Sequence, residues 1–377
     1  IIIELTNWPQ RITNGTVMVV EKFYDSPISL IPPHPSGIEA YSYKLLHGPD
    51  FALVTYSAKH CFDFIKGFQE LVKLFEGRTL PAPLQKVLTS IERTINKEQF
   101  AVVHKYHSSD NLSNSEKLAL AHFVRYGYKH NMHSLVVLYA QIDAWYGMAV
   151  AVQKFGLVFP DFVQSDGPVI EAKGMYHLLV QEPVAYTVVL NQKTNFLFLT
   201  GANMAGKSTF IKSVGASVFL AHIGMGVPAK QMKLTLFDGL LSNINVVDNI
   251  ARGESYFYNE VQRIKSTIIK LSNGKKWLIL MDELFKGTNV QDAMKCSSTV
   301  IEGLIKVKNS LFILSTHLYE IGEDLKKYPN IDFKYFETSV INDQLHFSYH
   351  LKDGISNDRL GYLILKREGV VEMLEKM

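Results

Sequence analysis

Residues 196–209 read FLFLTGANMAGKST. The apolar start is typical of a buried strand, and a helical pattern follows the segment. Between them, Gly201 and Gly206 enclose a short loop that ends in Lys207 and Ser208, the spacing G-x4-G-K-S. In this context glycines let backbone N–H groups surround phosphates, and the helix N-terminus favours negative charge. A chance glycine-rich turn is the alternative. The segment predicts a loop that binds the phosphates of a nucleoside triphosphate.

A second motif lies further along the chain, where residues 277–283 read WLILMDE. An apolar strand that ends in Asp282 and Glu283 would place both carboxylates at the edge of a sheet, beside the phosphates. We expect Ser208 and Asp282 to hold Mg²⁺, Lys207 to neutralise the phosphates, and Glu283 to orient or deprotonate the attacking water. Such a pair on its own is common at a surface strand end. Together with the loop it favours hydrolysis of ATP in the manner of ABC-type ATPases.

A third motif is the run STH at residues 315–317, which ends another apolar segment. A histidine at this place can sense the γ-phosphate, and we assign that role to His317. The alternative is a structural histidine at a strand end.

The pattern of elements changes near residue 158. After it, short β-rich runs alternate with helical patterns, which predicts an α/β domain with a doubly wound, mainly parallel sheet over residues 158–377. The expected strands are residues 186–190, 196–200, 277–281 and 311–315.

Residues 1–157 are expected to form a mainly α-helical domain. Apolar residues at helical spacing mark residues 61–75 and 84–100. Ser113 and Glu116 form a predicted capping box. Residues 134–152 are apolar on more than one face, which indicates a helix buried between others rather than a membrane span.

The composition narrows the class of protein. The 377 residues are 47% apolar and 20% charged, enough for two globular domains. Two cysteines exclude a disulfide scaffold and a multi-cysteine zinc site, and they fit a reducing cytoplasm. A net charge of +3 gives no bulk attraction to nucleic acid. We predict no membrane segment, and because the chain starts without methionine we expect a piece of a longer protein.

These motifs together resemble the MutS family. The run at residues 200–209 is similar to that family's P-loop, T-G-P-N-M-G-G-K-S-T. Further segments follow in the family's order, and they are residues 223–229, 248–257 with Glu260, 280–283 with Gly287 and Thr288, Thr316 with His317, and Asp353 and Gly354 with Gly361. Gln141 to Asp143 resembles the end of the family's lever helices. The resemblance covers residues 135–377 well and residues 1–134 only by position.

The resemblance implies an ATPase of DNA mismatch repair that works as a homodimer on double-stranded DNA in the cytoplasm, associated with the nucleoid when on DNA. Each ATP site would be completed by the partner's signature segment, which is residues 248–257 with Glu260, so Ser255 would face the partner's γ-phosphate. Asn203 would contact phosphate or water, and Tyr349 and Val184 would flank the adenine, although both residue types are also common in β-rich cores. Downstream repair factors are possible partners. The expected nucleotide contacts in the loop are Gly201, Ala202, Asn203, Met204, Ala205, Gly206, Lys207, Ser208 and Thr209.

Some residues depart from the family pattern. Ala202 and Ala205 replace the usual Pro and Gly, Glu254 stands in the signature segment, and residues 289–292 read NVQD. Phe68 and Glu70 match the letters of the family's F-x-E mismatch wedge, but Phe68 falls on the apolar face of a predicted helix, so we interpret it as core.

Three alternatives remain open. The chain could be a MutS homologue that acts in recombination or on branched DNA, which a native chain without a mismatch-reading domain would favour. It could be a scaffold that ATP gates, with incidental turnover, and Glu254 favours that view. A different ABC-type ATPase is disfavoured because the chain has no L-S-G-G-Q signature.

Overall fold

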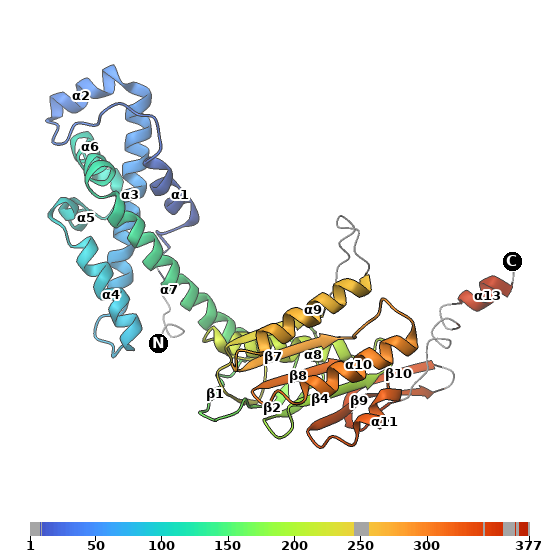
Figure 1. Ribbon diagram of the computed structural model, residues 1–377. Helices are drawn as coiled ribbons and strands as arrows, with labels where there is room; N and C mark the ends of the chain where they lie inside the picture. Colours follow the sequence, from blue (N-terminus) through green and yellow to red (C-terminus); the bar gives the residue numbers. More distant parts are fainter. Residues whose placement is uncertain are drawn as a thin grey trace. The chain divides into compact units, whose positions relative to one another are not determined.

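A computed structural model of the protein describes residue 8 and residues 10–244, 256–341, 344–356, 366 and 369–375. The chain forms two compact units, divided between Ala151 and Val152. The first unit is helical, as expected, and the described strands all belong to the second (Figure 1). The functional identities given above to residues 1–157 and 158–377 stay predictions.

The first unit is built around helix α3, which packs the residues expected to form its apolar face. Phe64, Ile65, Phe68 and Leu71 have no exposed surface, so the interpretation of Phe68 as core is confirmed. The capping box also forms, at the start of α6 with Ser113 as N-cap. The helices are α1 (Asn14–Phe23), α2 (Gly37–Leu46), α3 (Gly48–Leu74), α4 (Ala82–Ile95), α5 (Ala101–Lys105), α6 (Asn114–His122) and α7 (Lys129–Phe155), with 3-10 turns at Glu98–Phe100 and Ser109–Asn111 and a π-helical turn at Phe123–Gly127.

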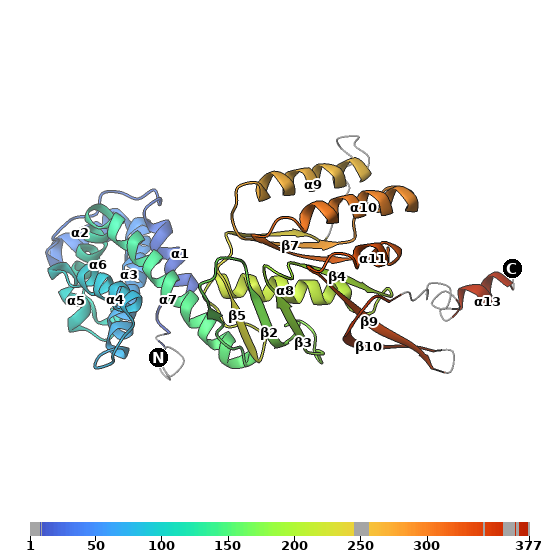
Figure 2. The same cartoon turned by 60° about the horizontal axis from the view of Figure 1, so that its bottom comes forward.

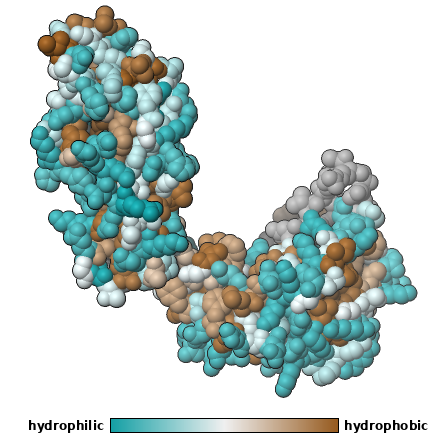
Figure 3. All heavy atoms as spheres, turned by 60° about the vertical axis from the view of Figure 1, so that its left-hand side comes forward, coloured by the Kyte–Doolittle hydropathy of each residue, from teal (hydrophilic) through white to brown (hydrophobic). Residues whose placement is uncertain are grey.

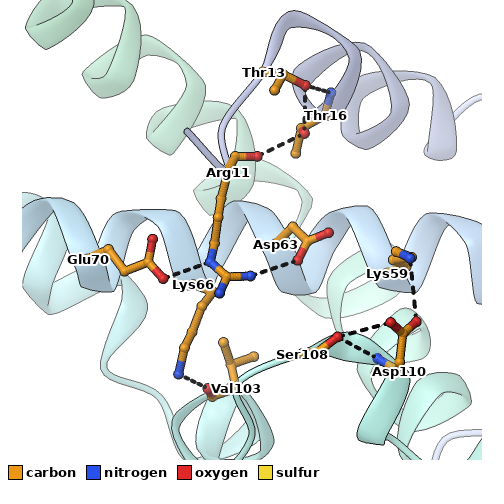
Figure 4. A network of polar contacts seen from close by, with 10 residues as sticks. All are labelled: Arg11, Thr13, Thr16, Lys59, Asp63, Lys66, Glu70, Val103, Ser108 and Asp110. Atoms are coloured by element: carbon orange, nitrogen blue, oxygen red, sulfur yellow. Dashed lines mark hydrogen bonds and ion pairs between the residues drawn. The ribbon is translucent and has the colours of Figure 1, made fainter. Parts of the chain in front are cut away.

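Polar contacts tie the chain before α1 to the side of α3 (Figure 4). Arg11 donates from Nε to Glu70 at 2.7 Å, and its Nη1 lies 3.6 Å from an Asp63 oxygen. Between these carboxylates, a Cβ on Gly67 would come within 2.5 Å of the Ile12 side chain. Glycine at this position therefore lets the segment lie close against α3.

Helix α7 does not have the burial that its composition suggests. Only Met132, Leu135 and Ile142 are buried along its length, so the expectation of a helix buried between others is wrong. Among the described residues it is the one helix long and apolar enough to cross a membrane, and 11% of its most apolar stretch is buried. Core helices of soluble proteins meet the same criteria of length and composition, so these alone do not assign α7 to a membrane.

Apolar side chains also gather on the surface at the α2 end of the first unit (Figure 3). Ile38, Tyr41, Leu45 and Leu46 of α2 are each more than 60% exposed. The helix buries Ala40 and Tyr43 instead, so its outer face is apolar without being part of the core.

The second unit contains two sheets. The larger has the strand order β10-β9-β4-β8-β7-β6, in which every neighbouring pair is parallel except β9 and β10. The smaller has the order β1-β5-β2-β3, in which only β1 and β5 are parallel. The strands are β1 (Asp161–Phe162), β2 (Ile170–Met175), β3 (Tyr186–Leu190), β4 (Phe196–Gly201), β5 (Gln231–Leu234), β6 (Gly239–Asn243), β7 (Trp277–Asp282), β8 (Ser310–Ser315), β9 (Ile331–Ile341) and β10 (Gln344–Asp353).

The expected fold class, one doubly wound and mainly parallel sheet over residues 158–377, is therefore wrong. The chain has a helical region followed by strands in a mixed arrangement, and β3, which we expected beside the others, belongs to the smaller sheet. Buried parallel strands are continuous apolar runs that a sequence reveals, whereas β2, β5, β9 and β10 alternate apolar with polar residues. Each of these four strands has at least one antiparallel neighbour, and the sequence did not predict them.

Helices cover both faces of the larger sheet (Figure 2). Leu197 and Leu199 of β4 pack in the cluster that includes α8, while Phe196 and Phe198 pack in the cluster on the side of α9, α10 and α11. This alternation follows from the two-residue period of a strand. The helices that begin in the second unit are α8 (Lys207–His222), α9 (Tyr256–Leu271), α10 (Val290–Leu304), α11 (Glu320–Leu325) and α13 (Val370–Glu375).

Candidate functional site

The predicted phosphate-binding loop joins β4 to α8. Gly201 and Gly206 have φ angles of 135° and 110°, which favour glycine, and Gly206 is the N-cap of α8. A Cβ on Gly201 would lie 3.2 Å from the carbonyl oxygen of Phe336 on β9. Met204 also has a left-handed φ of 68°. The loop therefore turns sharply onto the N-terminus of α8, where free N–H groups favour an anion.

Lys207 lies at the base of this loop and is 6% exposed. Its ammonium donates to the carbonyl oxygens of Gly201 and Ala202 at 2.7 and 2.8 Å. Burial lowers the pKa of Lys207 to about 8, although the carboxylates of Glu283 and Asp282 act to raise it. Lys207 is thus a cation with little hydration, held at the loop.

Asp282 ends β7 and joins two hydroxyl groups. Ser208 donates to its Oδ2 at 2.6 Å, and Ser315, at the end of β8, donates to its Oδ1. The two residues predicted to hold Mg²⁺ are therefore in direct contact. The role of Ser315 was not predicted, although it lies in the run of residues 315–317 that the sequence singled out.

Glu283 follows Asp282 with a left-handed φ of 61°. Its carboxylate lies 2.8 Å from Nε2 of His317 and 3.0 Å from Nζ of Lys286. Burial raises the pKa of Glu283, but the hydrogen bonds from His317 and Lys286 outweigh it and the pKa falls to about 2. The sequence analysis did not predict the ion pair between Lys286 and Glu283. The signal that could have indicated it is a basic residue three positions after the glutamate.

Lys207, Ser208 and Glu283 line one cavity of about 460 Å³. Its walls include Asn203, Thr209, Val184 and Tyr349, as predicted, and also His177 and Glu182, which were not. The volume falls in the range of small-molecule sites. The cavity could therefore hold a nucleotide with its phosphates at the loop.

Tyr349 reaches the cavity through a break in a strand. The register of β10 against β9 shifts between Phe347 and Leu351, and Tyr349 has a left-handed φ of 55°. A Cβ on Gly206 would lie 3.4 Å from the ring of Tyr349. A bulge that turns a side chain in this way is common beside functional sites.

Gly201, Ala205, Asp282 and His317 are predicted site residues that do not line the cavity. Two further positions named from the sequence are not described. Ser255 and Glu254 of the signature segment lie outside the described residues. The predicted roles of the site residues, including the sensor role of His317, stay predictions.

We expect ATP affinity to fall as the pH rises above about 8, because Lys207 of the free protein then loses its proton. Phosphates stabilise the charged amine, so binding requires proton uptake above this pH, and affinity falls by about tenfold per unit well above it. The measurement is the dissociation constant of a non-hydrolysable ATP analogue from about pH 7 to about 9.5. Lys207→Arg stays charged and should remove this dependence. An equal fall in both proteins would contradict the assignment.

Comparison with known proteins identifies relatives that match about two thirds of the chain. Residues 197–374 match the family model of MutS domain V. The DNA mismatch repair protein MutS of Lactococcus lactis subsp. cremoris (strain SK11) is 29% identical over 253 residues, which are 66% of this chain and 30% of that protein. The protein of the same name from Thermotoga maritima is 30% identical over 235 residues, 61% of this chain and 29% of that protein. The chain thus spans about 30% of the length of these relatives.

The matched region contains the loop, Asp282, Glu283 and His317 but begins at residue 197. It leaves out residues 158–196, which we had included in the ATPase domain. The predicted resemblance to MutS is thereby confirmed, and it lies in the C-terminal part of the chain, which matches MutS domain V.

Proposed function

We propose that the chain binds ATP with Mg²⁺ and hydrolyses it to ADP and phosphate in the cavity beside residues 201–209. The observation that carries the proposal is the 2.6 Å hydrogen bond from Ser208 to Asp282. It joins the start of α8 to the end of β7 and leaves Glu283 in the wall of the same cavity. Phosphate, cation and water sites would then meet within one space.

The donors fit Mg²⁺. The ion favours few protein ligands and completes its octahedron with water and substrate phosphates. One carboxylate and one hydroxyl, from Asp282 and Ser208, supply that number. The described residues contain no metal site built from three or more His, Cys, Asp or Glu side chains, so a site here would depend on water and phosphate for its other ligands. When bound, the ion would supply positive charge at the β- and γ-phosphates.

The contacts support three further proposed roles. The Lys207 ammonium would exchange the carbonyl oxygens of Gly201 and Ala202 for phosphate oxygens. Glu283 would accept a proton from water once its contacts with Lys286 and His317 loosen, because a carboxylate held at a pKa of about 2 is a weak base. His317, bonded to Glu283, would report the γ-phosphate to it.

Binding of the nucleotide would use more of the cavity wall. Tyr349 and Val184 would flank the base, and Asn203 would contact phosphate or water. All three line the cavity. The other nucleotide contacts would come from the loop itself.

The role in DNA repair rests on the relatives, whose name is DNA mismatch repair protein MutS. We propose that the chain acts in the cytoplasm as part of a homodimer on double-stranded DNA, with Ser255 completing the partner's ATP site, and that downstream repair factors follow. A homologue that acts in recombination or on branched DNA is the second candidate.

A scaffold with incidental turnover is a further candidate. The observation that favours it is the pairing of Glu283 with both Lys286 and His317, which occupies the carboxylate and lowers its pKa, so that it is a weak base. The scaffold would bind ATP in the same cavity, so affinity for ATP does not separate the two functions.

The test is steady-state ATP turnover per chain over a wide range of protein concentration, for the wild type and Ser255→Ala. We expect specific activity to rise with concentration and the variant to lose most of it. Turnover that is independent of both would contradict the composite site, provided the molecular mass at the lowest concentration is that of a monomer. No turnover at any concentration would contradict hydrolysis and favour the scaffold.

A further inference from the structure

A buried carboxylate on α9 contacts the turn that carries Glu283. Glu260 is 6% exposed. Its Oε1 accepts a hydrogen bond from the backbone N–H of Lys286 at 3.1 Å, and its Oε2 accepts one from the N–H of Gly287 at 3.2 Å. A buried carboxylate is costly unless its oxygens are paired, and here each oxygen has a backbone donor. The side chain therefore fixes the backbone at residues 286 and 287.

The turn that it fixes is strained. Glu283 and Phe285, two residues apart, both have left-handed φ angles, 61° and 59°. Side chains other than glycine keep this conformation only where the surroundings impose it. The bonds from Glu260 supply part of that constraint, and the rings of Phe257 and Phe285, 5.7 Å apart, supply a second contact between α9 and the turn.

The constraint reaches the proposed base through Lys286. The backbone of Lys286 is held by Glu260, and its ammonium lies 3.0 Å from the Glu283 carboxylate. Helix α9 begins at Tyr256, directly after the segment that ends in Ser255. A displacement of α9 would therefore move the turn.

We propose that Glu260 is a positioning residue that couples the position of α9 to the orientation of Glu283. The proposal rests on the hydrolysis proposed above, with Glu283 as the base. Glu260 itself lies behind the turn and does not line the cavity.

The test compares Glu260→Ala and Glu260→Gln with the wild type. Alanine removes both hydrogen bonds, whereas the glutamine oxygen can still accept one of them. We expect kcat to fall by about 100-fold in the alanine variant, the size of effect that a shift of about 1 Å at a reacting group produces, and by less in the glutamine variant. The dissociation constant of a non-hydrolysable ATP analogue should change little.

Two readouts separate positioning from a general loss of structure. Hydrogen exchange of the amides of Lys286 and Gly287 should speed up in both variants. The loss should appear in kcat, with the KM for ATP little changed, because the loop and Lys207 keep their contacts. Thr267→Val is the matched control, since it removes a buried hydrogen bond on α9, from Thr267 to the carbonyl oxygen of Arg263, and should change neither readout.

Each result decides one of the two proposals. Glu260 variants with the kcat of Thr267→Val, or with unchanged exchange of the two amides, would overturn the coupling and leave hydrolysis intact. A wild-type protein without turnover would overturn hydrolysis, and with it the coupling. If Glu260→Ala fails to fold, Glu260→Gln replaces it in the test. A lower kcat with unchanged ATP affinity in that variant supports the coupling, and an unchanged kcat overturns it.

Discussion

Glu283→Gln should lower ATP turnover by about 10²- to 10⁴-fold, the usual contribution of a general base, while ATP binding persists. Glutamine has the same shape but cannot accept the proton of the attacking water. The loop, Lys207 and Asp282 keep their contacts with each other, so the phosphates should still bind. The measurements are single-turnover hydrolysis and the dissociation constant of ATP for the variant.

Glu323→Gln is a matched control for this substitution. Glu323 and Lys326 form an ion pair with the same spacing in the sequence as Glu283 and Lys286, but on the surface. Loss of that exposed pair should leave turnover unchanged, since such pairs contribute little. Equal turnover in Glu283→Gln and the wild type would contradict the role of the base and support the scaffold.

Phe68→Ala should destabilise the first unit by about 3–5 kcal/mol, the usual cost of removing a buried phenylalanine. Phe68 has no exposed surface, and its ring packs edge-on against Phe64 and Tyr139 at centroid distances of 5.0 and 5.9 Å. The cavity left behind would lie between α3 and α7. Denaturant unfolding in a Trp277→Phe background measures this, because the remaining tryptophans, Trp8 and Trp145, both belong to the first unit.

Tyr41→Ala serves as its control. Tyr41 is an aromatic residue of the same unit that is 62% exposed, so its removal should change the free energy of unfolding by about 0.5 kcal/mol or less. If Phe68→Ala instead lost DNA binding while its unfolding resembled that of Tyr41→Ala, the interpretation of Phe68 as a core residue would be wrong. The result would then favour Phe68 as part of a mismatch-reading F-x-E motif.

Much of the fold could be predicted where the signal is local. The continuous apolar runs of β4, β7 and β8 and the capping box at Ser113 depend on neighbours in the sequence, and all are present. Strands β2, β5, β9 and β10 have mixed polarity, and their partners decide their direction. Helix α7 was predicted to be buried from its apolar composition, and it is not. Composition does not specify which elements pack against a helix.

In the candidate site, the spacing of residues 201–209 and the pair Asp282 and Glu283 indicated the chemistry, because a loop between strand and helix and a strand end are local features. The contact of Ser208 with Asp282 follows from two strands of one sheet. Lys286, Ser315 and Glu260 have no motif of their own, and their roles come from hydrogen bonds and ion pairs.

The sequence by itself determined the loop, its lysine and the acidic strand end, since glycine, charge and apolar runs act over a few residues. Only the tertiary structure decided that β10 breaks its register to turn Tyr349 into the cavity, and that Glu260 on α9 holds the turn after Glu283. Those contacts join segments far apart in the chain. Their geometry depends on how sheets and helices pack, because burial turns a polar side chain towards whichever donor the fold brings near.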